Sequence, residues 1–254
     1  MKLLRSVGVA FLVSTAFVGA YGPTIAFAQQ AGPSALNQLP PALRAALVSG
    51  NVESIQSAIQ TLSGGNPTQA ASLAQQVVAI AEGVADANPQ LAIAAAQAAV
   101  SIVSNSPIQT SAPAAANNVA AIAARIIVNP NVIRVAPAQV AQVATQAVRV
   151  ATSPRVYQAN PTASVQVAAN SYAAANNSAV VAVSPGAVQQ VTSAISQAST
   201  SQNLNAANPG NSAQLQNILL QNQGGQNNQE QNGESDSEIP VIQGSELVDN
   251  ASPT

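Results

Sequence analysis

The chain contains no cysteine and no histidine, and its single lysine is Lys2. Without cysteine it cannot form disulfides, use a thiol nucleophile or carry a lipid on a thiol. The residues after position 28 therefore cannot assemble a Ser-His, Cys-His or Ser-Lys catalytic pair. They also lack the imidazole and thiolate groups that bind zinc and related metals. These absences predict a protein that is not an enzyme and holds no cofactor or metal.

Charged and aromatic residues are also scarce, at 6% and 2% of the chain. Residues 29–222 contain five arginines and three acids, which give a net charge of +2. The other six acids lie in residues 223–254, which carry a net charge of −6. The polar surface of residues 29–222 must therefore consist mainly of Asn, Gln, Ser and Thr, whose character hardly changes with pH or salt.

The hydrophobic residues are mostly Ala and Val, which predicts a thin core and closely packed helices. Residues 87–124 contain no charged side chain. They do not have the pattern of a membrane span, because amide side chains and prolines interrupt them. We expect no transmembrane segment in the chain that remains after position 28.

Residues 1–28 have the pattern of a secretory signal peptide. Lys2 and Arg5 precede an apolar stretch over residues 7–18, and small residues follow that end in an A-x-A motif at 26–28. The apolar stretch is shorter than the roughly 20 residues that a bilayer span needs. The pattern predicts export, cleavage after Ala28 and a periplasmic or extracellular protein. The alternative is a retained membrane anchor.

Prolines recur with a fixed 24-residue period, which is typical of a repeat array. Asn or Ser precedes most of them, and such residues cap helix N-termini, while proline suits the first helical position. We therefore expect a helix to begin at each proline. Asn66-Pro67 has the same pattern one slightly shorter interval earlier and adds an irregular unit. The six periodic prolines are Pro89, Pro113, Pro137, Pro161, Pro185 and Pro209.

Three positions of each unit predict how it packs. The residue six after the proline is apolar in every unit, and the residue ten after it lies on the same helix face. The helix should end near position 16, where a second proline often follows. The residue nineteen after the proline lies in the connector to the next unit and is again apolar. In order these connector residues are Ile108, Val132, Val156, Val180 and Leu204.

The connectors leave two architectures open. Segments such as 132–135 and 180–183 are rich in β-branched residues and have an extended character. They are therefore either short parallel strands of an α/β solenoid or apolar loops of an all-α solenoid. Residues 42–59 are expected to form a helix, a tight turn at Gly50-Asn51 and a second helix. This pattern favours a mainly α fold with short extended connectors.

The chain divides into four parts by composition. We expect a signal peptide over residues 1–28, an N-terminal helical hairpin or cap over 29–66, and a helical repeat array over 67–222. Residues 223–254 are rich in Gln, Asn, Gly, Ser and acids, which is typical of a disordered tail. In the last unit the connector position falls on Asn228 rather than on an apolar residue, as expected for the end of an array.

Four arginines form the only constellation that suggests a binding site. Arg125 and Arg149 occupy the same repeat position, so stacked units would place them in one row with Arg134 and Arg155 nearby. Such a row can bind phosphate or carboxylate groups of lipid or polysaccharide. The alternatives are simple solubilisation or pairing with the acidic tail. Glu82 and Asp86, on one expected helix, are interpreted as a solvated helix face rather than a carboxylate pair or a calcium site.

These features favour an exported, non-enzymatic repeat protein that acts as a structural scaffold or interaction surface in the periplasm or cell envelope. One alternative is a self-assembling component of a fibre or extracellular matrix. Another is a binder of anionic lipid head groups or polysaccharide through the arginine row. The expected partners are thus a second copy, an envelope protein or an anionic glycan or lipid. Nucleic acid is not expected, because the basic residues are few and only two tyrosines lie near them.

Overall fold

The computed structural model describes residues 36–226, and this part of the chain is mainly α-helical, as predicted. It contains no β-strand within these residues, so the α/β alternative is wrong there. The predicted signal peptide and nearly all of the predicted acidic tail lie outside the described residues. The last helix continues to Gln226, past the predicted start of the tail at 223.

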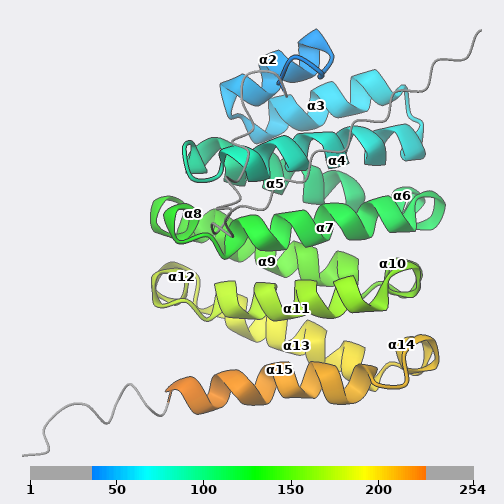
Figure 1. Cartoon of the computed structure of the whole chain (residues 1–254), viewed down its shortest axis with the longest axis vertical. Helices are drawn as coiled ribbons and strands as arrows, with labels where there is room; N and C mark the ends of the chain where they lie inside the picture. The colour runs from blue at the N-terminus through cyan, green and yellow to red at the C-terminus, as the bar shows by residue number, and fades with distance from the viewer. Residues whose placement is uncertain (1–35, 227–254) are drawn as a thin grey trace, which may run out of the picture. The chain divides into compact units, whose positions relative to one another are not determined.

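From α5 onward, long and short helices alternate along the chain (Figure 1). The N-terminal pair is α2 (Pro41–Ser49) and α3 (Val52–Ser63). The long helices are α4 (Pro67–Val84), α5 (Pro89–Val103), α7 (Pro113–Ile127), α9 (Pro137–Ala151), α11 (Pro161–Ala175), α13 (Gly186–Thr200) and α15 (Asn211–Gln226). The short helices between them are α6 (Ser106–Ser111), α8 (Pro130–Val135), α10 (Pro154–Ala159), α12 (Ser178–Val183) and α14 (Gln202–Ala207).

Prolines begin most of the long helices, as the sequence predicts. Five of these helices, from α4 to α11, start at a periodic proline or at Pro67. Where Asn precedes the proline, its side chain caps the helix; Asn88 Oδ1 accepts the backbone N–H of Leu91 at 3.1 Å. The prediction is inaccurate at the last two units, because α13 begins one residue after Pro185 and α15 begins two residues after Pro209.

The connectors are short helices rather than extended segments, which corrects the sequence-based expectation. Asn129 and Asn177 accept backbone N–H groups at the N-termini of α8 and α12 at 2.9 and 3.0 Å. The second prolines, such as Pro130, occupy the first turn of these helices instead of only ending the previous one. The β-branched residues are helical here because burial of the residue at position nineteen outweighs the weak intrinsic preference for strand.

The turn between α2 and α3 agrees with the prediction from residues 42–59. Gly50 adopts a left-handed conformation with φ 63°, which favours glycine and ends α2. Asn51 then caps α3, and its Oδ1 accepts the N–H of Ser54 at 2.8 Å. The chain therefore reverses within two residues.

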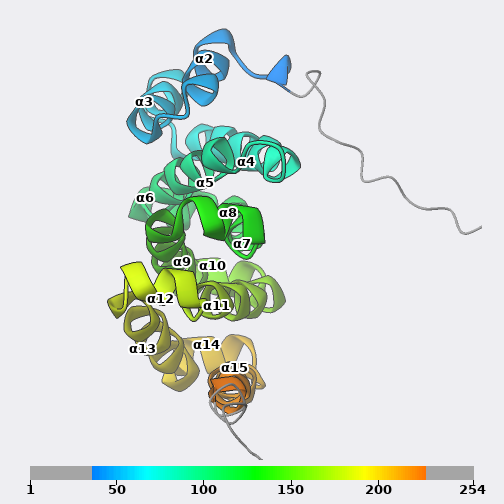
Figure 2. The same ribbon diagram turned by 90° about the vertical axis from the view of Figure 1, so that its left-hand side faces the viewer.

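The long helices are arranged in two series, which Figure 2 shows in end view. In one series α4, α7, α11 and α15 contact each other in that order, and in the other α3, α5, α9 and α13 do so. Each helix also packs against its sequence neighbours in the opposite series. The short helices α6, α10 and α14 lie at one end of the long helices, and α8 and α12 lie at the other (Figure 1). Equivalent residues of consecutive units therefore belong to different series, whereas those of alternate units belong to the same one.

The core includes the residues at the two positions that the sequence pattern predicts to be buried. The apolar residue at position six is buried in every unit from Ala95 to Leu215. The connector residue at position nineteen is also buried in each of the five connectors. The core is rich in Ala, so its helices approach closely, and its largest fully buried side chain is Tyr157 on α10.

A buried amide connects helices of neighbouring units. Asn117 of α7 is fully buried, and its Nδ2 lies 3.0 Å from the backbone oxygen of Val156 and 3.2 Å from that of Asn160. The same nitrogen lies 2.7 Å from Ser164 Oγ on α11. The amide thus donates to carbonyl groups at the α10–α11 junction, one of which, that of Asn160, also accepts the backbone N–H of Ser164 at 3.1 Å.

Candidate ligand-binding grooves

The structure separates the four arginines that the sequence singles out. Arg125 lies on α7 and pairs with Glu82 on α4, in the same series. Its Nε donates to Glu82 Oε1 at 2.5 Å and its Nη2 donates to Oε2 at 3.1 Å. The hydrogen bond with Glu82 raises the pKa of the Arg125 guanidinium. This side chain is therefore already engaged by a carboxylate.

Arg149 lies on α9, in the opposite series, and faces α5 and α13 rather than α4. The structure therefore does not bring Arg125 and Arg149 into one row. The reason is the alternation of units between the two series, which places equivalent positions of consecutive units on different sides. Anion binding by these arginines remains a prediction.

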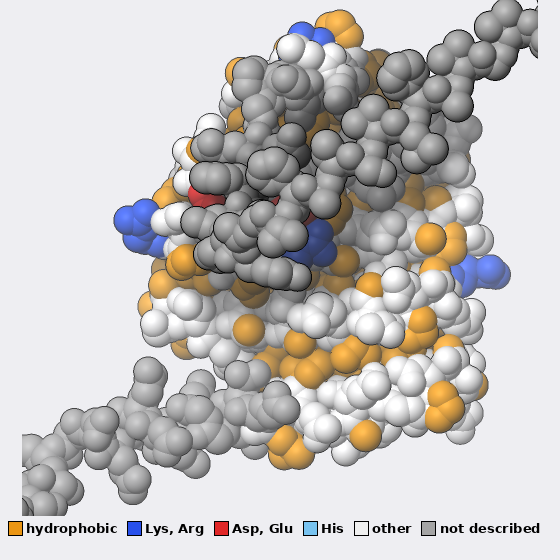
Figure 3. Space-filling model, viewed as in Figure 1, with side chains coloured by type: hydrophobic (Ala, Val, Ile, Leu, Met, Phe, Trp, Pro, Cys, Tyr) orange, Lys and Arg blue, Asp and Glu red, His pale blue; other side chains and the backbone are white. Residues whose placement is uncertain are grey.

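Arg134 and Arg155 lie at opposite ends of the long helices, on α8 and α10. Arg134 Nη2 donates to Asn131 Oδ1 at 3.1 Å, and both arginines are exposed. On the face drawn in Figure 3, the Lys and Arg side chains lie apart rather than in one patch.

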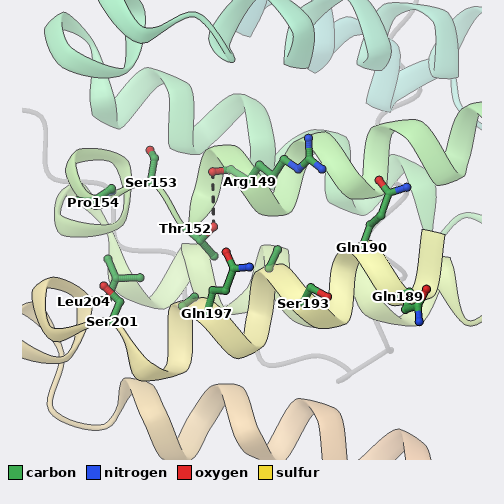
Figure 4. A pocket seen from close by; sticks show the side chains of 12 residues that line it. Arg149, Thr152, Ser153, Pro154, Gln189, Gln190, Ser193, Gln197, Ser201 and Leu204 are labelled. Atoms are coloured by element: carbon green, nitrogen blue, oxygen red, sulfur yellow. Dashed lines mark hydrogen bonds between the residues drawn. The ribbon is translucent and has the colours of Figure 1, made fainter. Parts of the chain in front are cut away.

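A hollow runs between α9 and α13, and Figure 4 shows it from close by. Its volume is about 620 Å³. Arg149 and Thr152 line it from α9, while Gln190 and Gln197 extend toward it from α13. Ser193 and Ser201 add hydroxyl groups, and Ser153, Pro154 and Leu204 line the end near α10 and α14.

Two further hollows adjoin this one and share Arg149. One, of about 410 Å³, continues between α9 and the start of α13, from Gln142 and Gln146 to Ser184 and Gly186. The other, of about 320 Å³, lies between α5 and α9 and is lined by Ser101, Ser104, Gln109, Gln146, Arg149 and Val150. We call the three together the Arg149 groove. Arg149 lies at the point where they meet.

The Arg149 groove has one cation, and its other polar side chains are neutral amides and hydroxyls that alternate with apolar surface. No acidic residue lines it. Within residues 36–226 the guanidinium of Arg149 makes no hydrogen bond or ion pair. The two acids of α4 and the following turn are engaged elsewhere, Glu82 by Arg125 and Asp86 by Asn129 at 2.7 Å. The Oε1 atom of Gln146, three residues before Arg149 on α9, is buried and has no donor among residues 36–226.

These groups can form hydrogen bonds with a ligand. Amide, hydroxyl and guanidinium groups offer hydrogen-bond donors and acceptors along an open groove. The described residues contain no group of three or more His, Cys, Asp or Glu side chains that could hold a metal ion. None of their helices is both long enough and apolar enough to cross a bilayer. Glu82 and Asp86 bind separate partners and do not act as a pair.

The sequence interpretation missed the groove because it compared consecutive units. Between alternate units the relevant positions are Ser101, Arg149 and Gln197, on α5, α9 and α13. Arg149 lines one hollow with Ser101 and another with Gln197. A comparison of alternate units would have found this set.

The comparisons with known proteins give no relative for this chain. No protein-family model, no curated protein and no solved structure matches it.

Proposed function

We propose that the chain is an exported, non-catalytic solenoid of helical repeats that serves as an interaction surface or scaffold of the periplasm or cell envelope. Two series of stacked long helices support the repeat architecture. The A-x-A leader pattern in the sequence supports export. The lack of His, Cys and Lys after position 28 supports a function that does not depend on catalysis.

The Arg149 groove is the observation that carries this proposal. It is open, it spans α5, α9 and α13, and its walls offer many neutral donors and acceptors. Repeat arrays typically bind extended partners along such faces rather than small molecules in enclosed pockets. An extended polymer chain is accordingly the kind of ligand that fits along α9 and α13.

Site-specific photocrosslinking in the native cell tests this function. A crosslinking residue at Gln190 or Gln197 in the groove should give a discrete crosslinked product in the envelope fraction. The same residue at Ala173 is a matched control, because it is exposed on α11 in the other series. Equal products from both positions would contradict the proposal. A hydrolytic activity that a point mutation abolishes would contradict it as well.

Export is tested separately by sequencing the N-terminus of the envelope form. The proposal predicts a chain that begins at Gln29. A chain that retains Lys2 and fractionates with the cytoplasm contradicts it.

A further inference from the structure

We propose that the acidic segment 234–238 of the chain's own C-terminal tail binds in the Arg149 groove. The first argument is charge complementarity. No acid occurs in the sequence between Asp86 and Glu230. The groove holds a guanidinium without a carboxylate partner in the described residues, and the segment 230–254 holds six of the nine acids of the chain.

The second argument is position. The start of α15 lies beside the end of α13, because Asn211 Nδ2 donates to the backbone oxygen of Ala198 at 2.9 Å. The two helices also pack against each other and have nearly equal lengths. The end of α15 therefore lies level with the start of α13, on the side where α12 lies (Figure 1). The groove opens at that same end, where Ser184 and Gly186 line it.

The third argument is that the chain after Gln226 is long enough to bring Glu234 to Arg149. The groove residues Gln190 and Gln197 lie about 6–17 Å along α13 at about 1.5 Å per residue. Crossing to the outer side of α13 adds roughly one helix diameter, about 10–12 Å. The path from Gln226 to Arg149 is thus on the order of 20–30 Å. Glu234 follows Gln226 by eight residues, and an extended chain covers that distance at about 3.3 Å per residue.

The side chains of the groove suit an extended peptide. A primary amide presents a donor and an acceptor side by side, which matches the N–H and C=O groups of an extended backbone. Gln146 lines one wall and Gln190 and Gln197 line the other, while Gln142, also on the first wall, already accepts a hydrogen bond from Gln97 Nε2 at 2.7 Å. Arg149 then pairs with one of three closely spaced carboxylates, at Glu234, Asp236 and Glu238.

Paramagnetic labelling of the full chain tests the contact. The chain has no cysteine, so Ser237→Cys accepts a single spin label. At low salt the label should broaden the NMR signals of the Gln190 and Gln197 side-chain amides. Arg149→Gln should lower the ratio of bound to free tail about two- to five-fold, as expected for an exposed ion pair. Arg134→Gln is the matched control, because it removes the same charge at the end from which the tail departs.

Three outcomes would overturn the proposal. The first is broadening that persists unchanged when Glu234, Asp236 and Glu238 are replaced by amides. The second is an equal loss of broadening in the Arg134→Gln and Arg149→Gln chains, which shows unspecific attraction. The third is broadening that arises only between chains, in a mixture of spin-labelled and isotope-labelled protein, because the groove then binds a second copy.

Discussion

Asn117 shows how much a single polar residue contributes to this thin core. Its amide nitrogen is fully buried and has three acceptors, on α10, on α11 and at their junction. Replacement by Ala removes the donor that the Val156 carbonyl and the Ser164 hydroxyl share, whereas the Asn160 carbonyl keeps the backbone N–H of Ser164. The sequence did not reveal this role, because Asn117 and Asn118 are adjacent residues of the same type. Only the folded structure shows that Asn117 is buried and Asn118 is exposed.

Asn117→Ala is therefore expected to lower the free energy of unfolding by about 1–3 kcal/mol, the cost of leaving buried polar groups unpaired. Asn118→Ala is the control and should change it by about 0.5 kcal/mol or less. Urea denaturation of the two variants makes the comparison. Equal losses would contradict the role assigned to Asn117.

Tyr157 makes the stability of the fold sensitive to alkaline pH. Burial raises the pKa of its hydroxyl, and the hydrogen bond from Asn208 Nδ2 at 3.2 Å partly opposes that rise. Because the folded pKa exceeds the unfolded value of about 10, its contribution is fully present below pH 10. The contribution is lost as the pH rises through the folded pKa.

The unfolding midpoint of the native chain should therefore fall faster above about pH 10 than that of Tyr157→Phe. Thermal unfolding followed by circular dichroism at several pH values measures both. Parallel pH profiles for the two chains would show that Tyr157 does not titrate with folding.

At the scale of elements, each short helix packs against the long helices through one or two buried side chains, and one of them is always the residue at position nineteen. Val132 and Val135 lie on the same six-residue helix, α8, but Val132 is fully buried whereas Val135 is 38% exposed. A helix of this length is not stable alone. Its stability must come from the contact that Val132 makes with the long helices.

Val132→Ala should cost about 2 kcal/mol in unfolding free energy, from two lost methyl groups and the space they leave. Val135→Ala should cost about 0.5 kcal/mol or less, because the side chain is largely solvated. Denaturation of both variants measures the difference. A similar effect at both positions would mean that burial at position nineteen does not stabilise the connector.

The sequence predicted the long helices well and the connectors poorly, for identifiable physical reasons. Proline and Asn signal a helix start locally, so five helix starts could be placed without knowledge of the packing. A connector such as 130–135 spans fewer than two helical turns, so periodicity cannot distinguish it from an extended segment. Its β-branched residues favoured an extended segment, but packing against the long helices makes this segment helical.

At the scale of the whole array, the decisive feature is the alternation of units between two series. The 24-residue period predicted that Arg125 and Arg149 form one row, and this failed because equivalent side chains on one side recur only in alternate units. The same alternation places α5, α9 and α13 side by side and so creates the Arg149 groove. The proposed interaction surface depends on it.

Deletion of whole units tests this central claim most directly. Removal of residues 137–184 takes out two units and leaves α13 in the series from which α9 was lost. Removal of residues 161–184 takes out one unit and forces α13 into the opposite series. An alternating array predicts that the two-unit deletion keeps a helical circular dichroism spectrum and cooperative urea unfolding, whereas the one-unit deletion loses cooperativity. Two equally cooperative variants, or a two-unit deletion that fails to unfold cooperatively, would contradict it.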